Sequence, residues 1–147
     1  MKLTRASSYA LHAVAYMALQ KTDRPVASHK IAQERGIPER FLLKVLKPLV
    51  TARVLTSIKG PNGGYRLARA PADITMLEIV EAVEQAKIEG TAPPPVSDPK
   101  TIKEDYPNYK PENSLPLFHK LENLCKQTAD IVRKSLEKVR VSELLKK

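Results

Sequence analysis

The chain has 147 residues, which fits one domain with a real core and excludes a large multidomain enzyme. Its one cysteine excludes an internal disulfide framework, and no apolar run approaches the roughly 18 residues of a membrane span, so a cytoplasmic protein is expected. The net charge of +9 lies wholly in residues 1–70, with thirteen basic against three acidic residues, which predicts a polyanionic partner and favours nucleic acid over a merely basic protein.

The first predicted element is a helix over residues 5–21. Thr4 precedes it and is predicted to cap its free amides, because a threonine oxygen accepts from the first turn. One face is expected to be buried, and its apolar residues fall at helical spacing: Leu11, Val14, Ala15, Ala18 and Leu19.

Two short helices follow, separated by a glycine turn. The first is expected to begin at a Ser28 cap and to stop at Gly36. Pro38 opens the second, since proline suits the first turn of a helix. This order predicts a helix-turn-helix, with the second helix ending or bending at Pro48.

The second helix of this pair has two unlike faces at 100° per residue. One is expected to pack and carries Phe41, Leu42, Val45, Leu46 and Leu49. The other carries Arg40, Leu43, Lys44 and Lys47. An ordinary solvated face mixes charge signs, whereas only Glu39 dilutes this one, so the basic face is predicted to be free for a partner.

Residues 54–68 read as two short strands joined by a turn at Asn62-Gly63. The glycine cluster is not a phosphate loop, because Gly64 is followed by Tyr65 and Arg66 rather than by lysine and a hydroxyl residue. Nor does it open a helix, as a dinucleotide fingerprint does. It is therefore predicted to form the slender tip of a wing that meets DNA.

The C-terminal half contains two more helices and a linker. Residues 74–84 predict a helix with a capping box formed by Thr75 and Glu78. Residues 90–116 hold seven of the twelve prolines and predict an extended linker. Residues 114–139 predict a long helix with a wide apolar stripe, which favours a two-fold helix pair over folding back on its own domain.

Four blocks of this sequence, in order, resemble the bacterial IscR/NsrR/CymR-type winged-helix regulators (the Rrf-two family): "MKLTRASSYAL", "PVASHKIAQERGIPERFLLKVLKPLV", "KGPNGGYRLAR" and "ITMLEIVEAVE". The long helix and "VSELL" are similar to the dimerisation tail of that family. The resemblance implies a homodimeric transcription factor, usually a repressor, on an operator with two-fold symmetry. Its recognition helices would enter major grooves and its wings the adjacent minor grooves.

The resemblance has one clear departure. Family members that sense nitric oxide, oxidants or cluster status hold an iron–sulfur cluster through three cysteines in the segment matching residues 90–111, and this chain has none there. Cys125 alone cannot hold a cluster, and His12, His29 and His119 lack ligand spacing. No cluster, metal or other cofactor is expected, and residues 90–116 leave room for an unknown effector or protein partner.

The predicted fold is mostly α with a small β-hairpin. It comprises a winged helix-turn-helix DNA-binding domain at 1–89, a linker at 90–116 and a dimerisation helix with a tail at 117–147. Arg40 and Lys44 are the candidate base readers. The full DNA-binding set is Ser28, His29, Glu39, Arg40, Leu43, Lys44, Lys47, Lys59, Asn62 and Arg66. The dimerisation set is Leu117, Phe118, Leu121, Leu124, Cys125, Ile131, Val132 and Leu136.

Three alternatives bear on these roles. An enzyme is not expected, because the chain has no GxSxG, HExxH or paired Cys/His arrangement. A basic interaction module that binds RNA or an acidic protein remains the alternative function. For Leu43, contact with a thymine methyl and a tolerated surface leucine are both open.

Overall fold

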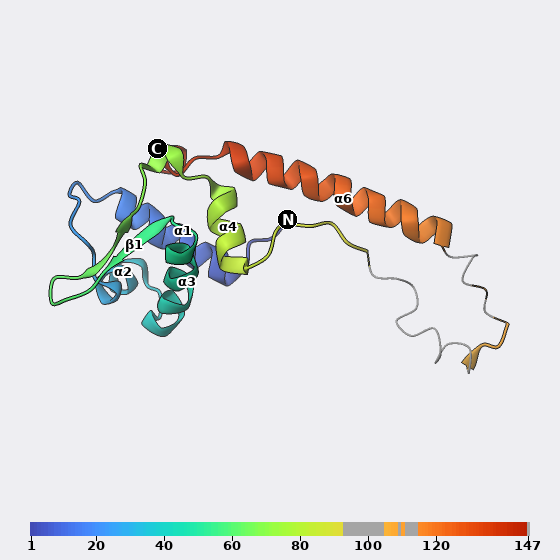
Figure 1. Cartoon of the computed structure of the whole chain (residues 1–147), viewed down its shortest axis with the longest axis horizontal. Helices are drawn as coiled ribbons and strands as arrows, with labels where there is room; N and C mark the ends of the chain where they lie inside the picture. Colours follow the sequence, from blue (N-terminus) through green and yellow to red (C-terminus); the bar gives the residue numbers. More distant parts are fainter. Residues whose placement is uncertain (93–104, 109, 111–114, 147) are drawn as a thin grey trace. The chain divides into compact units, whose positions relative to one another are not determined.

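The computed structural model describes residues 1–92, 105–108, 110 and 115–146 (Figure 1). It comprises two compact units, Met1–Lys87 with Lys134–Lys147, and Ile88–Arg133. The elements of the first unit are α1 (Arg5–Ala18), α2 (Ser28–Arg35), α3 (Glu39–Thr51), β1 (Leu55–Ile58), β2 (Gly64–Leu67), a 3-10 turn (Pro71–Asp73), α4 (Met76–Glu84) and α7 (Val141–Leu144). Helix α6 (Leu115–Lys138) begins in the second unit and ends in the first.

Helix α1 is the centre of the first unit, with α2, α3, α4, α7 and β2 packed against it. Thr4 caps it as predicted, because its hydroxyl accepts from the Ser7 amide at 3.1 Å. Of the expected buried face, Val14 is fully buried and Leu11, Ala15 and Ala18 are partly buried, whereas the prediction for Leu19 is wrong, since it is 54% exposed. Small side chains let five elements approach closely, so the buried face is Ser7, Ala10, Ala13, Val14 and Met17.

The helix-turn-helix consists of α2 and α3, and Gly36 between them adopts a left-handed φ of 63°. The predicted serine cap is wrong, because Ala27 occupies the cap position and Ser28 begins the helix. Of the predicted end or bend at Pro48, the end is wrong, since α3 continues to Thr51. Burial of Leu49 in the next turn outweighs the backbone hydrogen bond that proline removes.

The wing is an antiparallel hairpin in which Leu55 pairs with Leu67 and Ile58 with Gly64. Its turn lies one residue earlier than predicted: the Gly63 amide donates to the Gly60 carbonyl at 3.0 Å, which places Pro61 and Asn62 at its centre. Proline favours this position because its φ is already fixed. The connection between the strands therefore has Lys59 and Asn62 exposed near its tip.

Val26 adds a third backbone partner to the hairpin. Its amide donates to the Tyr65 carbonyl at 2.8 Å, and the Tyr65 amide donates to the Val26 carbonyl at 2.9 Å. Gly64 makes this approach possible, since a Cβ added there would lie 2.3 Å from the Val26 oxygen. The wing is thus fastened to the segment that leads into α2.

Helix α4 closes the core, and its predicted capping box between Thr75 and Glu78 is present. The chain returns to it at the end of α6: the Met76 amide donates to the Val139 carbonyl at 2.8 Å, and the Val141 amide donates to the Ile74 carbonyl at 2.9 Å. This return buries Leu136 and Val141 in the first unit. The C-terminal tail is therefore part of the winged-helix core.

Helix α6 carries two apolar stripes about 100° apart around its axis. The stripe of Phe118, Cys125, Ala129, Val132 and Leu136 is partly or fully buried within the chain. The backbone of Gly90 runs against this stripe at Cys125. The other stripe is exposed along its length and consists of Leu117, Leu121, Leu124 and Ile131, which are 45–66% exposed.

Most of the predicted linker at 90–116 lies outside the described residues. In the parts of the chain that are described, no helix combines the length and apolar character needed to cross a lipid bilayer.

Candidate nucleic-acid interface

Helix α3 is held by one face and presents the other to solvent. Its buried side chains are Leu42, Val45, Leu46 and Leu49. Because these residues recur at helical spacing, the opposite side chains are fixed in direction by the core. Arg40, Leu43, Lys44 and Lys47 are all exposed, as the sequence predicts.

Phe41 does not join the buried face, so this part of the sequence prediction is wrong. Its side chain is 38% exposed, whereas its neighbour Leu42 is fully buried. The Arg40 guanidinium carbon lies 4.7 Å from the centroid of the Phe41 ring, and the Lys44 Nζ lies 5.7 Å from it. An aromatic ring with two cations beside it therefore belongs to the basic face of α3.

The start of α2 lies against the start of α3. The Ser28 hydroxyl donates to the Glu39 carboxylate at 3.0 Å, so two of the predicted DNA-binding residues contact each other. This bond places the one acidic side chain of the face at the edge nearest α2. His29 is exposed beside it.

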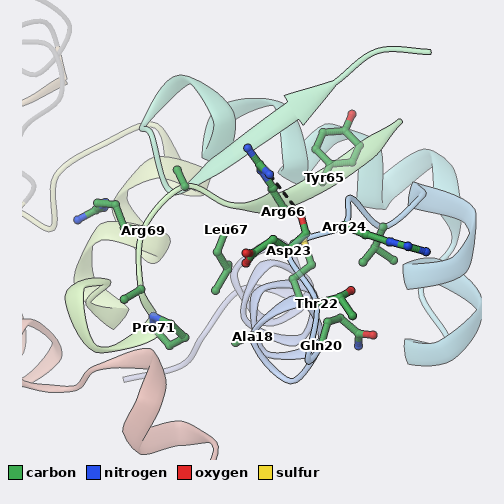
Figure 2. A pocket seen from close by; sticks show the side chains of 14 residues that line it. Ala18, Gln20, Thr22, Asp23, Arg24, Tyr65, Arg66, Leu67, Arg69 and Pro71 are labelled. Atoms are coloured by element: carbon green, nitrogen blue, oxygen red, sulfur yellow. Dashed lines mark hydrogen bonds between the residues drawn. The ribbon is translucent and has the colours of Figure 1, made fainter. Parts of the chain in front are cut away.

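The wing contributes three predicted residues, in two different situations. Lys59 and Asn62 are exposed near the tip. Arg66 lies on strand β2, and its Nη1 donates to the Asp23 carbonyl at 3.2 Å (Figure 2). Arg66 and Asp23 both line a groove of about 330 Å³ between the end of α1, the loop that follows it and β2. Arg66 thus also fastens the wing to this loop.

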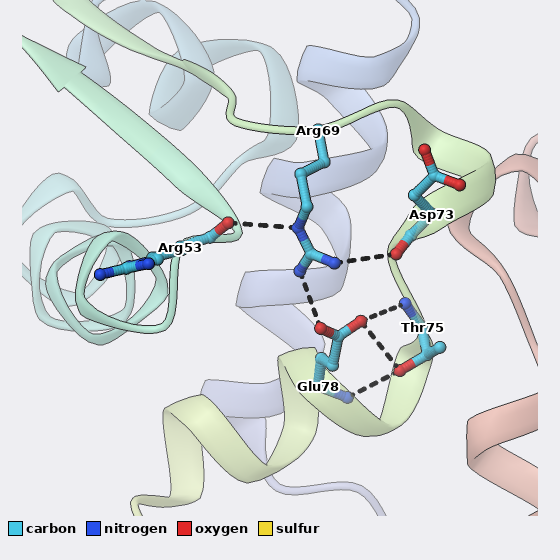
Figure 3. A network of polar contacts seen from close by, with 5 residues as sticks. All are labelled: Arg53, Arg69, Asp73, Thr75 and Glu78. Atoms are coloured by element: carbon cyan, nitrogen blue, oxygen red, sulfur yellow. Dashed lines mark hydrogen bonds and ion pairs between the residues drawn. The ribbon is translucent and has the colours of Figure 1, made fainter.

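Arg69, to which sequence reasoning assigns no role, joins three elements (Figure 3). Its Nη1 donates to the Asp73 carbonyl at 2.9 Å, its Nε to the Arg53 carbonyl at 3.4 Å and its Nη2 to the Glu78 carboxylate at 2.8 Å. Glu78 in turn accepts from the Thr75 amide at 2.9 Å. The base of the wing is therefore tied to the end of α3 and the start of α4.

This network lowers the pKa of Glu78. Partial burial acts in the opposite direction and by itself would raise it, but the bond from the Thr75 amide and the guanidinium of Arg69 together outweigh burial. Glu78 is thus held in its charged form by groups that also fix the geometry of the wing.

Among residues 1–92, 105–108, 110 and 115–146, no three His, Cys, Asp or Glu side chains lie close enough together to hold a metal ion. The three histidines belong to three separate helices, His12 to α1, His29 to α2 and His119 to α6. The described residues do form a cationic face on α3, and they place Lys59 near the wing tip.

The helix pair, the wing and the largely basic face of α3 define a winged helix-turn-helix protein suited to a polyanion. The family model Rrf2, described as iron-dependent transcriptional regulator, matches residues 3–147. The chain belongs to the Rrf2 family. The sequence resemblance and the mostly helical fold class with its hairpin are thereby confirmed.

Individual relatives agree with this membership. Protein rrf2 of Nitratidesulfovibrio vulgaris is 36% identical over 85 residues, covering 58% of this chain and 57% of that protein. The HTH-type transcriptional regulator IscR of Aliivibrio salmonicida is 34% identical over 86 residues, covering 58% of this chain and 51% of that protein. The chain thus spans about half the length of the curated relatives it matches. The family description and the name of IscR both denote transcriptional regulators, which agrees with the expectation that the chain is not an enzyme.

Solved structures share the fold. CymR, the global cysteine regulator of B. subtilis, has a TM-score of 0.67 at 23% identity, covering 99% of this chain and 96% of that chain. IscR of T. potens has a TM-score of 0.63 at 22% identity, covering 99% of this chain and 86% of that chain.

Proposed function

We propose that this protein is a homodimeric transcriptional repressor that binds a palindromic operator in the bacterial cytoplasm without an iron–sulfur cluster. The observation that carries the proposal is the basic face of α3, where Arg40, Lys44 and Lys47 are all exposed while the opposite face is locked into the core. A rigid helix with donors on one side suits the major groove, whose base edges carry a distinct pattern of acceptors.

The residues have separate roles in this proposal. Arg40 and Lys44 read base edges, since both donate to guanine O6 and N7. Ser28, His29 and Lys47 contact phosphates, helped by the free amides at the start of α2. Lys59, Asn62 and Arg66 bring the wing to the adjacent minor groove, and Leu43 contacts a thymine methyl. Glu39 fixes the register of α2 on α3 through Ser28.

The exposed stripe of α6 supports the dimer. Leu124 and Ile131 are 57% and 66% exposed, and a row of aliphatic side chains on one side of a long helix is stabilised by burial against a second copy. In the proposed division, residues 1–89 bind DNA, residues 90–116 link the parts, and residues 117–147 supply the dimerisation helix and a tail, which packs in the winged-helix core. Leu136, counted in the predicted dimerisation set, is buried within its own chain.

The donor atoms of this chain do not fit an iron–sulfur cluster, although its family is described as iron-dependent. Such clusters are held by several thiolates, commonly four, and each chain supplies one, Cys125. That thiol lies partly buried on the inner stripe of α6. The proposed regulator therefore responds to another signal.

Salt titration on duplex DNA tests the function. Genomic fragments retained by the purified protein supply the operator, and a scrambled duplex of equal length is the control. We expect preference for the palindromic site, and affinity that falls about a thousandfold or more between about 50 and 200 mM salt. Equal binding to both duplexes, or tighter binding to RNA, would favour the basic interaction module instead.

Two variants test the roles on α3. Arg40→Ala is expected to lose about 1–3 kcal/mol on the operator and to relax sequence choice at one position. Lys47→Ala is expected to weaken operator and scrambled duplex alike and to reduce the salt slope by about one. Competition binding on both duplexes measures this difference. The same proportional loss for both variants on both duplexes would refute the assigned roles.

A further inference from the structure

The Phe41 ring lies on the basic face of α3, and packing alone does not explain its position there. Phe41 lies one residue from the fully buried Leu42, yet it leaves 38% of its surface exposed. A phenylalanine placed only for the core would be covered, because burial of a ring is worth about 1.5–3 kcal/mol. Its exposed surface lies with Arg40 and Lys44, the two candidate base readers.

The geometry of these three side chains is that of a ring with two cations. The Arg40 Cζ is 4.7 Å and the Lys44 Nζ 5.7 Å from the ring centroid, both within the roughly 6 Å at which the ring quadrupole attracts a cation. Phe41 and Lys44 are three residues apart, which makes them neighbours on the helix surface. Arg40 precedes the ring and is the closer partner.

We propose that Phe41 is a positioning residue for sequence recognition: its ring holds the Arg40 and Lys44 side chains in the conformations that read bases. This inference rests on the proposed function. A guanidinium that stacks on a ring uses its face, while its N–H donors lie in its plane and stay available for a guanine edge. Stacking and base reading by Arg40 are therefore compatible.

The physical effect is pre-organisation. Fixing a long, flexible side chain on binding costs about 0.5–1.5 kcal/mol, and the ring restricts Arg40 and Lys44 before DNA arrives. Base reading needs a fixed geometry and gains from this restriction. Phosphate binding tolerates many side-chain conformations and gains little, so Phe41 should act on specific binding alone.

A matched pair of variants tests the proposal. Phe41→Leu keeps an apolar side chain and removes the ring, whereas Phe41→Tyr keeps the ring. On the selected operator, Phe41→Leu is expected to lose about five- to thirtyfold in affinity, because two long side chains must then be ordered on binding. On the scrambled duplex its loss should stay below about twofold, and Phe41→Tyr should bind the operator within about threefold of the wild type.

The coupling to Arg40 is measured with a double-mutant cycle on the operator. Once Arg40→Ala is present, Phe41→Leu should lose clearly less affinity than it does alone, because the main partner of the ring is gone. Ring-current shifts of the Arg40 and Lys44 methylene protons, present in the wild type and absent in Phe41→Leu, report the pairing without DNA. Phe41→Met, also ringless, replaces the leucine variant if thermal melting shows that variant to be unfolded.

If the wild type prefers its operator, three outcomes would overturn this inference and leave the proposed function standing. They are unchanged operator binding by Phe41→Leu, equal losses for Phe41→Leu on both duplexes, or operator binding by Phe41→Tyr as weak as that by Phe41→Leu. Absence of operator preference in the wild type would instead overturn the proposed function together with this inference.

Discussion

At the scale of single residues, three arginines of the first unit have different roles. Arg40 is exposed on α3 beside Phe41, Arg66 bonds to the loop after α1, and Arg69 joins the base of the wing to α3 and α4. Charge alone does not distinguish them, because all three carry the same guanidinium group. Their partners do: of the three, Arg69 forms an ion pair with a carboxylate, that of Glu78.

Glu78→Gln tests the electrostatic part of this network. Glutamine can still cap Thr75, so the change mainly removes the charge opposite Arg69. A folded-state pKa below the unfolded value of about 4.3 gives stability that is present above that value and is lost as the pH falls through the folded pKa. Wild type should therefore exceed Glu78→Gln in unfolding free energy at pH 7 by about 1 kcal/mol or less, since the pair is partly exposed.

Urea unfolding from pH 7 down to the acid limit of the native state measures this difference. The difference in unfolding free energy should shrink as the pH falls below the ordinary pKa range of a glutamate. A gap between the two proteins that stays constant with pH would contradict the role of the charge.

At the scale of elements, the wing keeps its place because one backbone passes very close to another. Gly64 has a φ of 152°, and the space where its Cβ would lie is filled by the Val26 backbone. Two backbone hydrogen bonds between Val26 and Tyr65 join the hairpin to the segment before α2. The position of the wing therefore depends on a residue without a side chain.

Gly64→Ala is expected to destabilise the protein by more than about 2 kcal/mol, because the backbone must move to accept the methyl group. Gly36→Ala is the matched control: its φ is also positive, at 63°, but nothing lies within 4 Å of the added Cβ, so strain alone should cost about 1–2 kcal/mol. Hydrogen exchange at the Tyr65 amide should rise in Gly64→Ala and not in Gly36→Ala. Equal effects of the two changes would argue against the close approach.

At the scale of the whole molecule, α6 serves two purposes along one helix. Its inner stripe is covered by the same chain, its last turn buries Leu136 in the winged-helix core, and Val139, just after the helix, accepts a backbone hydrogen bond from Met76. Its outer stripe is exposed. In the proposed dimer, a second copy covers the outer stripe. The inner stripe, which includes Leu136, is covered by the chain itself.

Leu124→Glu is expected to separate the dimer without unfolding the protein, because a charge on the outer stripe opposes burial against a second copy. Leu136→Ala is the contrasting change: Leu136 is 8% exposed, so its truncation should cost about 2–5 kcal/mol of stability. Sedimentation at several concentrations and thermal melting measure the two effects. A Leu124→Glu protein that still sediments as a dimer would refute the assigned interface.

Local sequence predicts much of this fold. The Thr4 cap and the capping box at Thr75 and Glu78 depend on side chains that bond to backbone a few residues away, and the Gly36 turn depends on a glycine with a left-handed φ, so the order of residues is enough to find them. The basic face of α3 follows from the helical period. The extent of each helix is less predictable, as Pro48 shows, because core packing overrides local propensity.

The sequence by itself determined the order of helices and hairpin, the capped helix starts and the basic side of α3, since each is a property of neighbouring residues. Only the tertiary structure decided which face of α1 is buried, that Phe41 leaves the core for Arg40 and Lys44, that Ser28 bonds Glu39 instead of capping, and that Arg69 joins three elements. The reason is physical: burial and hydrogen-bond partners are set by what packs against a side chain, and those groups come from distant parts of the chain.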